Sequence, residues 1–107
     1  MEVEAAQLIV HHDLYEMFSR AHRGDVATVE QRMHSRCCQA YVATLGVRAV
    51  DRLFAAAGGR ALQESNTLQR FYRDAHAASH HAALSWDILS EQYGRVLLGL
   101  DPTYMRF

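Results

Sequence analysis

The sequence predicts an all-α protein, an antiparallel four-helix bundle that forms a single domain over residues 1–107. Apolar residues recur at steps of three, four or seven over long stretches, which is the spacing of one helical face. The chain contains only one proline and six glycines, whereas a sandwich of short strands needs frequent turn residues. Its 107 residues suffice for one hydrophobic core.

The first two predicted helices cover the N-terminal half of the chain. One extends from Val3 to about His22. The other extends without a break from about Asp25 to Ala57, and Asp25 is its expected N-cap after a tight reversal at residues 23–25. At about 1.5 Å per residue this second helix would run roughly 50 Å, a length that suits an extended bundle.

The second half of this helix carries apolar residues on a second face, so we expect that half to contact other helices on both sides. The first stripe consists of Val29, Met33, Cys37, Ala40, Val47, Val50, Phe54 and Ala57, and the second of Tyr41, Val42, Leu45, Ala49, Leu53 and Ala56. Gly58 is expected to end the helix in the left-handed conformation. An apolar surface of this extent also predicts a homo-oligomer.

A third helix is expected to begin near Thr67, because Asn66 followed by Gln69 resembles a capping box. Its expected buried face consists of Phe71, Ala75 and Ala78. We predict a break or distortion around residues 80–86, after which a fourth helix, capped by Ser85 or Asp87, ends near Leu98. Gly99 and Pro102 follow as terminating residues.

Composition argues against several classes of function. The net charge of −1 and the pI of about 6.6 give no electrostatic reason to expect nucleic acid as a partner. The sequence has no run of the roughly 20 apolar residues that a membrane span needs. Residues 1–10 are unlike a signal peptide, and Cys37 and Cys38 are expected to be buried thiols in a reducing compartment. These observations predict a cytoplasmic protein that does not bind membranes.

A composite motif follows in the second half of the chain. It consists of residues 68–74 (LQRFYRD), residues 81–87 (HAALSWD) and residues 93–95 (YGR), preceded by residues 48–54 (RAVDRLF) and by Gly58-Gly59. This pattern, which covers residues 48–102, resembles the C-terminal domain of the acyl-CoA dehydrogenase-like superfamily. Within it, the pattern is similar to the flavin-dependent monooxygenase branch, the oxygenase subunits of phenol hydroxylases.

The resemblance implies FMN or FAD as the cofactor, a flavin reductase as a partner, and homo-oligomers assembled through this domain. Members of the family carry a helical domain and a β-domain ahead of this one. A flavin needs walls on both sides, so we expect this chain to bind flavin only with complementing domains or subunits. We also expect no monooxygenase activity from the chain alone, because water would reach the exposed face of the flavin.

His81 is the histidine that the resemblance places near the reactive face of the flavin. There it would assist deprotonation of a phenol or stabilise the hydroperoxyflavin, and an imidazole titrates near neutral pH. Asp87, six residues later, could orient the ring across the helix break. The alternative is that His81 only packs in a groove of the bundle.

Two departures from the dehydrogenase pattern argue against acyl-CoA dehydrogenation. Ala82 occupies the position of the catalytic glutamate, and alanine cannot accept a proton. Ala55 stands where dehydrogenases have a glutamine that contacts flavin. The glycine pair, Gly58 and Gly59, could still let a cofactor approach closely, although a helix C-cap alone would explain it.

Arg73 and Asp74 are the most specific part of the pattern. An arginine beside an aspartate can fix helix packing or a dimer interface, or contact a cofactor, and Arg73 is the candidate for that contact. No metal site is expected. His76 and His80 are four residues apart, as are His12 and Glu16, but a di-iron bundle needs Glu-x-x-His pairs, which the sequence lacks.

Three functions fit these observations. The chain could be the C-terminal domain of a flavin-dependent monooxygenase, completed by other parts. It could instead be a free-standing, non-redox binding or oligomerisation module, and the start at Met1 favours this alternative. The third is a small flavin-free enzyme in which His81, Asp87 and Tyr93 act on an aromatic or polyketide-like ligand, although Tyr93 and Trp86 are more often core residues.

Overall fold

The computed structural model describes residues 1–103, and these form four α-helices and two short 3-10 helices. The α-helices are α1 (Glu2–Arg23), α2 (Val29–Ala57), α3 (Thr67–Ser79) and α4 (Trp86–Leu97). The 3-10 helices are η1 (Gly58–Leu62) and η2 (Ala82–Leu84). The predicted all-α fold with four helices is confirmed. None of the described helices is long and apolar enough to cross a membrane.

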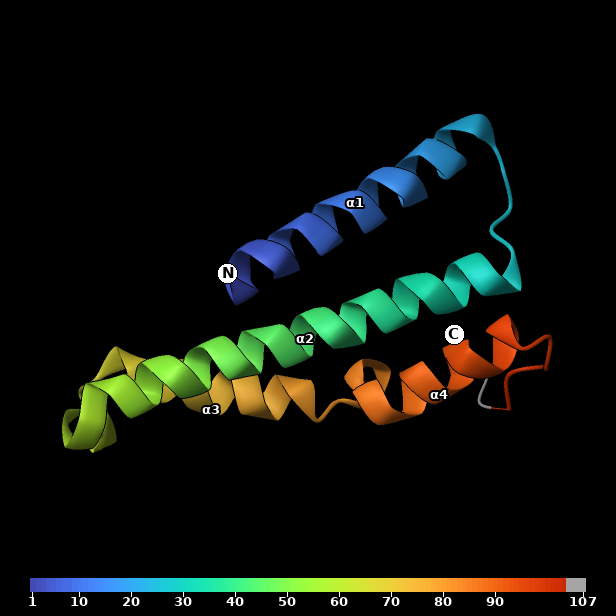
Figure 1. Cartoon of the computed structure of the whole chain (residues 1–107). Coiled ribbons are helices and arrows are strands. Elements are labelled where there is room, and N and C mark those ends of the chain that lie inside the picture. The colour runs from blue at the N-terminus through green and yellow to red at the C-terminus, as the bar shows by residue number, and fades with distance from the viewer. Residues whose placement is uncertain (104–107) are drawn as a thin grey trace.

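Helix α2 is the centre of the molecule (Figure 1). α1 lies along one side of α2 and runs antiparallel to it, while α3 and α4 lie end to end along the other side. The molecule measures 49 × 29 × 21 Å along its principal axes. The prediction that α2 contacts helices on both sides is therefore confirmed.

The hydrophobic core forms where α4 packs on the N-terminal half of α2. Met33, Ala40 and Leu89 are at most 1% exposed, and Tyr93 and Val96 pack against them. Burial of side chains as large as Met33 and Leu89 stabilises a fold by roughly 1.5–3 kcal/mol each. The first predicted stripe of α2 thus supplies the core at Met33 and Ala40.

Helix α2 begins four residues later than the sequence suggested. Thr28, not Asp25, is the N-cap: its Oγ1 accepts the Gln31 N–H at 3.2 Å, and its own N–H donates to Gln31 Oε1 at 3.0 Å. This reciprocal capping box satisfies two backbone N–H groups, those of Thr28 and Gln31. Asp25 instead accepts a hydrogen bond from Arg23 Nε at 2.8 Å, so the prediction of an Asp25 cap is wrong.

Gly58 ends α2, but not in the left-handed helical conformation that we expected. Its φ of 60° is positive while its ψ is −153°, and η1 follows directly. The left-handed cap occurs instead at the end of α1, where Gly24 has φ 74° and ψ 16°. Gly58 turns the chain into η1, and such a conformation is open almost only to glycine.

Helix α3 begins at Thr67, and Asn66 Oδ1 caps it by accepting the Leu68 N–H at 3.0 Å. The other half of the expected capping box is absent, because Gln69 Nε2 donates to the Leu62 carbonyl oxygen at 3.2 Å. The expected buried face is also wrong, since Phe71 is 58% exposed.

The adjacent Tyr72 turns toward α2, where its ring lies 4.3 Å from the ring of Phe54, centroid to centroid. One residue corresponds to about 100° of rotation on a helix, so an error of one residue in the predicted face exchanges Tyr72 for Phe71.

The predicted break between the third and fourth helices is confirmed. α3 ends at Ser79, η2 follows, and α4 begins at Trp86. Ser85 occupies the N-cap position of α4 without a side-chain hydrogen bond, and Asp87 lies in the first turn, where a carboxylate favours the helix dipole.

Candidate functional site

The break between α3 and α4 opens a cleft of about 290 Å³ against the middle of α2. α2 contributes Thr44, Val47 and Arg48, and the end of α3 contributes Ser79 and His80. The remaining lining residues belong to η2, the N-cap of α4 and its first turn: Leu84, Ser85, Trp86 and Asp87. A continuous α3–α4 helix would pack along α2 in this region, so the helix break is what makes the cleft.

The adjacent histidines at the break have opposite hydrogen-bonding states. His80 Nδ1 lies 2.6 Å from the carbonyl oxygen of His76. A carbonyl only accepts, so Nδ1 carries the hydrogen, and Nε2 of the neutral His80 ring is a proton acceptor. His81 Nδ1 accepts the Ala83 N–H at 3.2 Å, so its neutral ring carries the hydrogen on Nε2.

The structure brings one of the two predicted catalytic residues into the cleft. Asp87 lines it, whereas His81 is exposed and caps η2. The ring of His81 is held by the Ala83 N–H, not by Asp87. His80 lines the cleft together with Asp87, and the role expected of His81 stays a prediction.

Arg73 lies exposed on α3, and no described residue pairs with it. Asp74 pairs with Arg70 at 3.7 Å, between side chains that are 69% and 77% exposed. An exposed pair of this kind contributes little to stability. Within the described residues, Arg73 therefore has no partner, and Asp74 has only an exposed one.

Gly58 and Gly59 lie at the end of α2, about 15 Å along the helix axis from Arg48. A Cβ built at either position would meet nothing within 4 Å, so no neighbouring backbone of this chain requires a glycine there. Gly58 is required by its positive φ.

Three cleft residues had no role in the sequence-based site. Trp86 forms one wall, and its ring lies 5.2 Å from that of Tyr41, centroid to centroid. Arg48 belonged to the family-like pattern without a role, and the sequence considered His80 as a metal ligand and left open whether His80 or His81 faces a pocket. The sequence signal for His80 was its four-residue spacing from His76, which places it on the helix face that α3 turns toward α2.

His76 belongs to a contact between α3 and α2. Its Nε2 lies 2.7 Å from Asp51 Oδ1, and its ring stacks on Tyr72 with centroids 4.4 Å apart. Over residues 1–103, no group of three or more His, Cys, Asp or Glu residues is placed to hold a metal ion. His76 thus ties the two helices together.

A second cleft, of about 320 Å³, lies between α1, α2 and α4, with a polar lining: His12, Asp13, Glu16, Arg20, Glu30, Gln31, His34 and Tyr93. Asp13 is only 8% exposed, and its Oδ2 accepts a hydrogen bond from Ser35 Oγ at 2.8 Å. Desolvation, followed by the Glu30 carboxylate, raises the pKa of the Tyr93 phenol. Tyr93 also contacts the His34 ring edge-on at 5.5 Å, which makes it a packing residue.

The lining of the cleft at the helix break has side chains of the types that a flavin ring would need on one side. The cleft volume of about 290 Å³ is just below the range of ligand pockets, which is about 300–1,000 Å³. Trp86 offers an aromatic wall, Arg48 a cation, and His80 a proton acceptor. The described residues therefore supply one side of a site for a planar aromatic group and its polar edges.

Comparison with known proteins identifies the family. The family described as acyl-CoA dehydrogenase, C-terminal domain, matches residues 1–86. The oxygenase component of p-hydroxyphenylacetate 3-hydroxylase from Acinetobacter baumannii is 42% identical over 67 residues, which are 63% of this chain and 16% of that protein. A pigment production hydroxylase from Rhodococcus erythropolis is 37% identical over 101 residues, 94% of this chain and 26% of that protein.

A solved structure has the same fold. XiaF from Streptomyces sp., in complex with FADH2 and glycerol, superposes with a TM-score of 0.93 at 29% identity. The match covers 99% of this chain and 27% of that one, so the chain spans about a quarter of the length of these proteins. The four helices, the break between α3 and α4 and these similarities together establish that the chain belongs to the acyl-CoA dehydrogenase C-terminal domain family, with flavin-dependent hydroxylase oxygenase components among its relatives.

Proposed function

We propose that this chain acts as the C-terminal helical domain of a flavin-dependent aromatic hydroxylase, in which it completes the flavin and substrate site and drives self-assembly. The observation that carries the proposal is the cleft at the helix break, where His80, Arg48, Trp86 and Asp87 converge. Relatives named as hydroxylases or oxygenase components support the reaction class. A separate reductase would deliver the reduced flavin.

Four of the residues that line the cleft have a chemical task in this proposal. The free Nε2 of His80 accepts the proton of a phenol, and the Arg48 guanidinium stabilises the resulting phenolate. The Trp86 ring covers one face of an aromatic group, and Asp87 balances the charge of Arg48. A reduced flavin, when bound, supplies the electrons for hydroxylation.

The other predicted site residues would act where this chain meets the complementing domains or subunits. The exposed His81 has a hydrogen-bond donor at Nε2, because its Nδ1 accepts the Ala83 N–H, and Arg73 offers an exposed guanidinium. Gly58 and Gly59 leave open space at the end of α2 that a cofactor bound to a neighbouring chain can fill. FMN or FAD is therefore bound by the assembled enzyme and not by this chain alone.

Isothermal titration of the purified chain with FMN, FAD and their reduced forms tests the proposed contribution to flavin binding. We expect no tight binding by the chain alone. Binding that appears when the N-terminal and β-domains of a relative are added, and that weakens in Arg73→Ala, would support the proposal. A chain that never binds flavin with those domains present would contradict it.

A chimera tests the catalytic half. The chain replaces the matching segment of the Acinetobacter baumannii oxygenase component, and hydroxylation of p-hydroxyphenylacetate is measured with supplied reduced flavin. We expect His80→Ala to lower the rate about 100-fold or more, because it removes the proton acceptor. Glu91→Ala, an exposed change on α4 outside the cleft, is the matched control. Full activity of His80→Ala with loss in His81→Ala would assign the proton transfer to His81 instead.

A non-redox binding or oligomerisation module is the second candidate. The exposed apolar side chains on the outer side of α1, Leu8, Tyr15 and Phe18, favour it. The chimera separates the two functions, because a module of this kind would fold in the chimera without supporting hydroxylation.

A further inference from the structure

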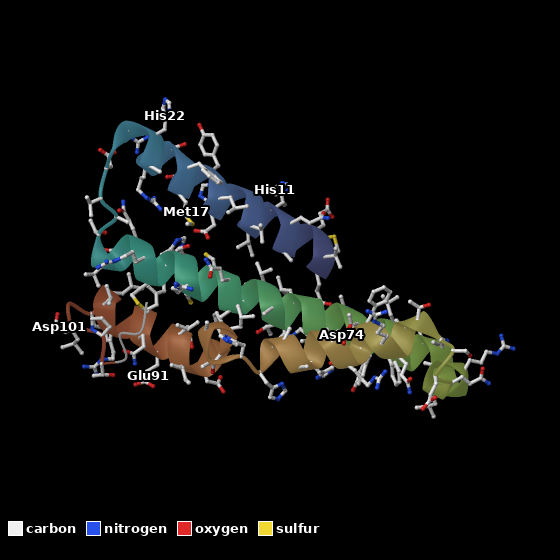
Figure 2. All side chains as sticks on the ribbon, turned by 180° about the vertical axis from the view of Figure 1, so that it is seen from behind. His11, Met17, His22, Asp74, Glu91 and Asp101 are labelled. Carbon is white, nitrogen blue, oxygen red and sulfur yellow. The ribbon has the colours of Figure 1, made fainter. Side chains whose placement is uncertain are left out.

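The face that α1 turns toward α2 changes from apolar to charged along the helix. Ile9 is followed on the same face, at steps of four, three and four, by Asp13, Glu16 and Arg20. In Figure 1 and Figure 2, α1 and α2 lie farther apart at the end of α1 that leads into Gly24 than at its start. Charged side chains resist burial against a second helix, so this end of the helix pair stays open.

The space at this end is the second cleft, of about 320 Å³, which lies within the size range of ligand pockets. Its lining carries three carboxylates, Asp13, Glu16 and Glu30, against one guanidinium, Arg20. Arg20 Nη1 lies 3.7 Å from Glu16 Oε2. Asp13 and Glu30 therefore have no cationic partner among the described residues, and the second cleft holds an excess of negative charge.

Asp13 is the group in this cleft that most needs a partner. The residue is only 8% exposed, and its Oδ2 accepts the Ser35 hydroxyl at 2.8 Å. Its Oδ1 accepts no hydrogen bond from residues 1–103, where every fully buried side-chain nitrogen or oxygen has a partner. Oδ1 is therefore an accessible atom of an otherwise buried side chain. One neutral hydroxyl does not balance a carboxylate charge, so this environment favours a cation.

Asp13 also borders an apolar cavity of about 240 Å³ between α1 and α2, which is lined as well by Ile9, Val10, Leu14, Cys38, Gln39 and Val42. The carboxylate thus has polar space on one side and apolar space on the other. A cation held at Asp13 can extend an apolar group toward these aliphatic side chains or toward the rings of Tyr93 and His34 in the second cleft.

The other residues of the second cleft also suit an organic cation. After desolvation, the Glu30 carboxylate is the next cause that raises the pKa of the Tyr93 phenol, so the charge of Glu30 reaches the ring. Aromatic faces attract cations, and the Tyr93 and His34 rings lie 5.5 Å apart, centroid to centroid. The described part of the chain places no three His, Cys, Asp or Glu residues to hold a metal ion. An ammonium needs only hydrogen-bond acceptors and an aromatic face.

We propose that the second cleft binds a small organic ammonium ion, a primary amine that carries an apolar group. Asp13 and Glu30 accept its N–H groups, and the apolar group packs beside Asp13. This function is separate from the one proposed above, because the second cleft shares no residue with the cleft at the helix break.

Isothermal titration of the purified chain with three molecules of similar shape tests the proposal. Phenethylamine carries an ammonium, phenethyl alcohol a neutral hydroxyl, and phenylacetate a carboxylate. We expect phenethylamine to bind with a dissociation constant of about 1 mM or less and the alcohol to bind at least about 10-fold more weakly. Phenylacetate should bind more weakly still, because the carboxylates of the cleft repel it.

Two variants locate the binding. Asp13→Asn keeps an oxygen for the Ser35 hydroxyl but removes the charge, and should weaken phenethylamine binding at least about 10-fold. Glu30→Gln, at an exposed position in the first turn of α2, should weaken it about 3-fold, and it tests the site even if Asp13→Asn disturbs the packing of α1. Asp74→Asn, which changes an exposed carboxylate of α3, is the matched control and should leave binding unchanged.

Circular dichroism checks that every variant stays helical. The proposal is overturned if phenethylamine does not bind, if the three molecules bind equally, or if Asp74→Asn weakens binding as much as Glu30→Gln does. Binding that favours phenylacetate and is lost in Arg48→Ala would place the ligand in the cleft at the helix break and would also overturn it. None of these titrations contains flavin, so their outcome leaves the proposed hydroxylase function untouched.

Discussion

The thiols of Cys37 and Cys38 show how burial changes the chemistry of single residues. Both are free cysteines, and Cys37 is only 9% exposed. Desolvation raises the pKa of both thiols, and the Asp13 carboxylate raises that of Cys38 further. The folded chain therefore keeps these protons at a pH where the unfolded chain has released them.

This difference predicts a loss of stability in alkaline solution. Unfolded thiols ionise near pH 8.5, so above about pH 8 the unfolded state binds fewer protons than the folded state, and the free energy of unfolding falls as pH rises. Urea unfolding at pH 7.5 and 9.5 measures the fall. We expect a smaller fall in Cys37→Ala/Cys38→Ala. An equal fall in that variant would assign the effect to other groups.

The two adjacent glycines should respond very differently to substitution. Gly58 has φ 60° and ψ −153°, which an L-residue rarely adopts, whereas Gly59 has no positive φ. We expect Gly58→Ala to lower the free energy of unfolding by about 1–3 kcal/mol and Gly59→Ala to change it by about 0.5 kcal/mol or less. Thermal or urea unfolding checks both. Similar losses in the two variants would contradict the backbone explanation.

At the scale of the element, the start of α2 depends on Thr28. Its hydroxyl accepts the Gln31 N–H, and Gln31 returns a hydrogen bond. Thr28→Ala should therefore cost about 1 kcal/mol of unfolding free energy, while Asp25→Ala, which removes only an exposed pair with Arg23, should cost about 0.5 kcal/mol or less. Urea unfolding of the two variants decides which residue caps the helix. A larger loss in Asp25→Ala would restore the cap that the sequence suggested.

The sequence predicted elements better than the orientation of residues within them. Four helices, the Asn66 cap and the break near residues 80–86 could be predicted, because periodicity and capping residues are local signals. Tyr72 and His80 could not be chosen over Phe71 and His81, because one residue of rotation depends on packing against α2. Asp87 was expected near the break and lies in the first turn of α4, whereas the role expected of His81 stays a prediction.

On the scale of the whole molecule, we expect α2 and α1 to differ in how well their backbone amides are protected from hydrogen exchange. α2 packs against α1, α3 and α4, whereas α1 packs chiefly on α2. We expect amide hydrogen exchange to be slowest in the middle of α2 and faster in α1. Uniform protection of all helices would contradict this order.

The cleft at the helix break takes its residues from α2 to α4 and none from α1. α1 ends at Arg23, and the first cleft residue, Thr44, lies in the second half of α2. Substitutions within α1 therefore leave every residue that lines the cleft unchanged, and substitutions in the cleft leave the sequence of α1 unchanged.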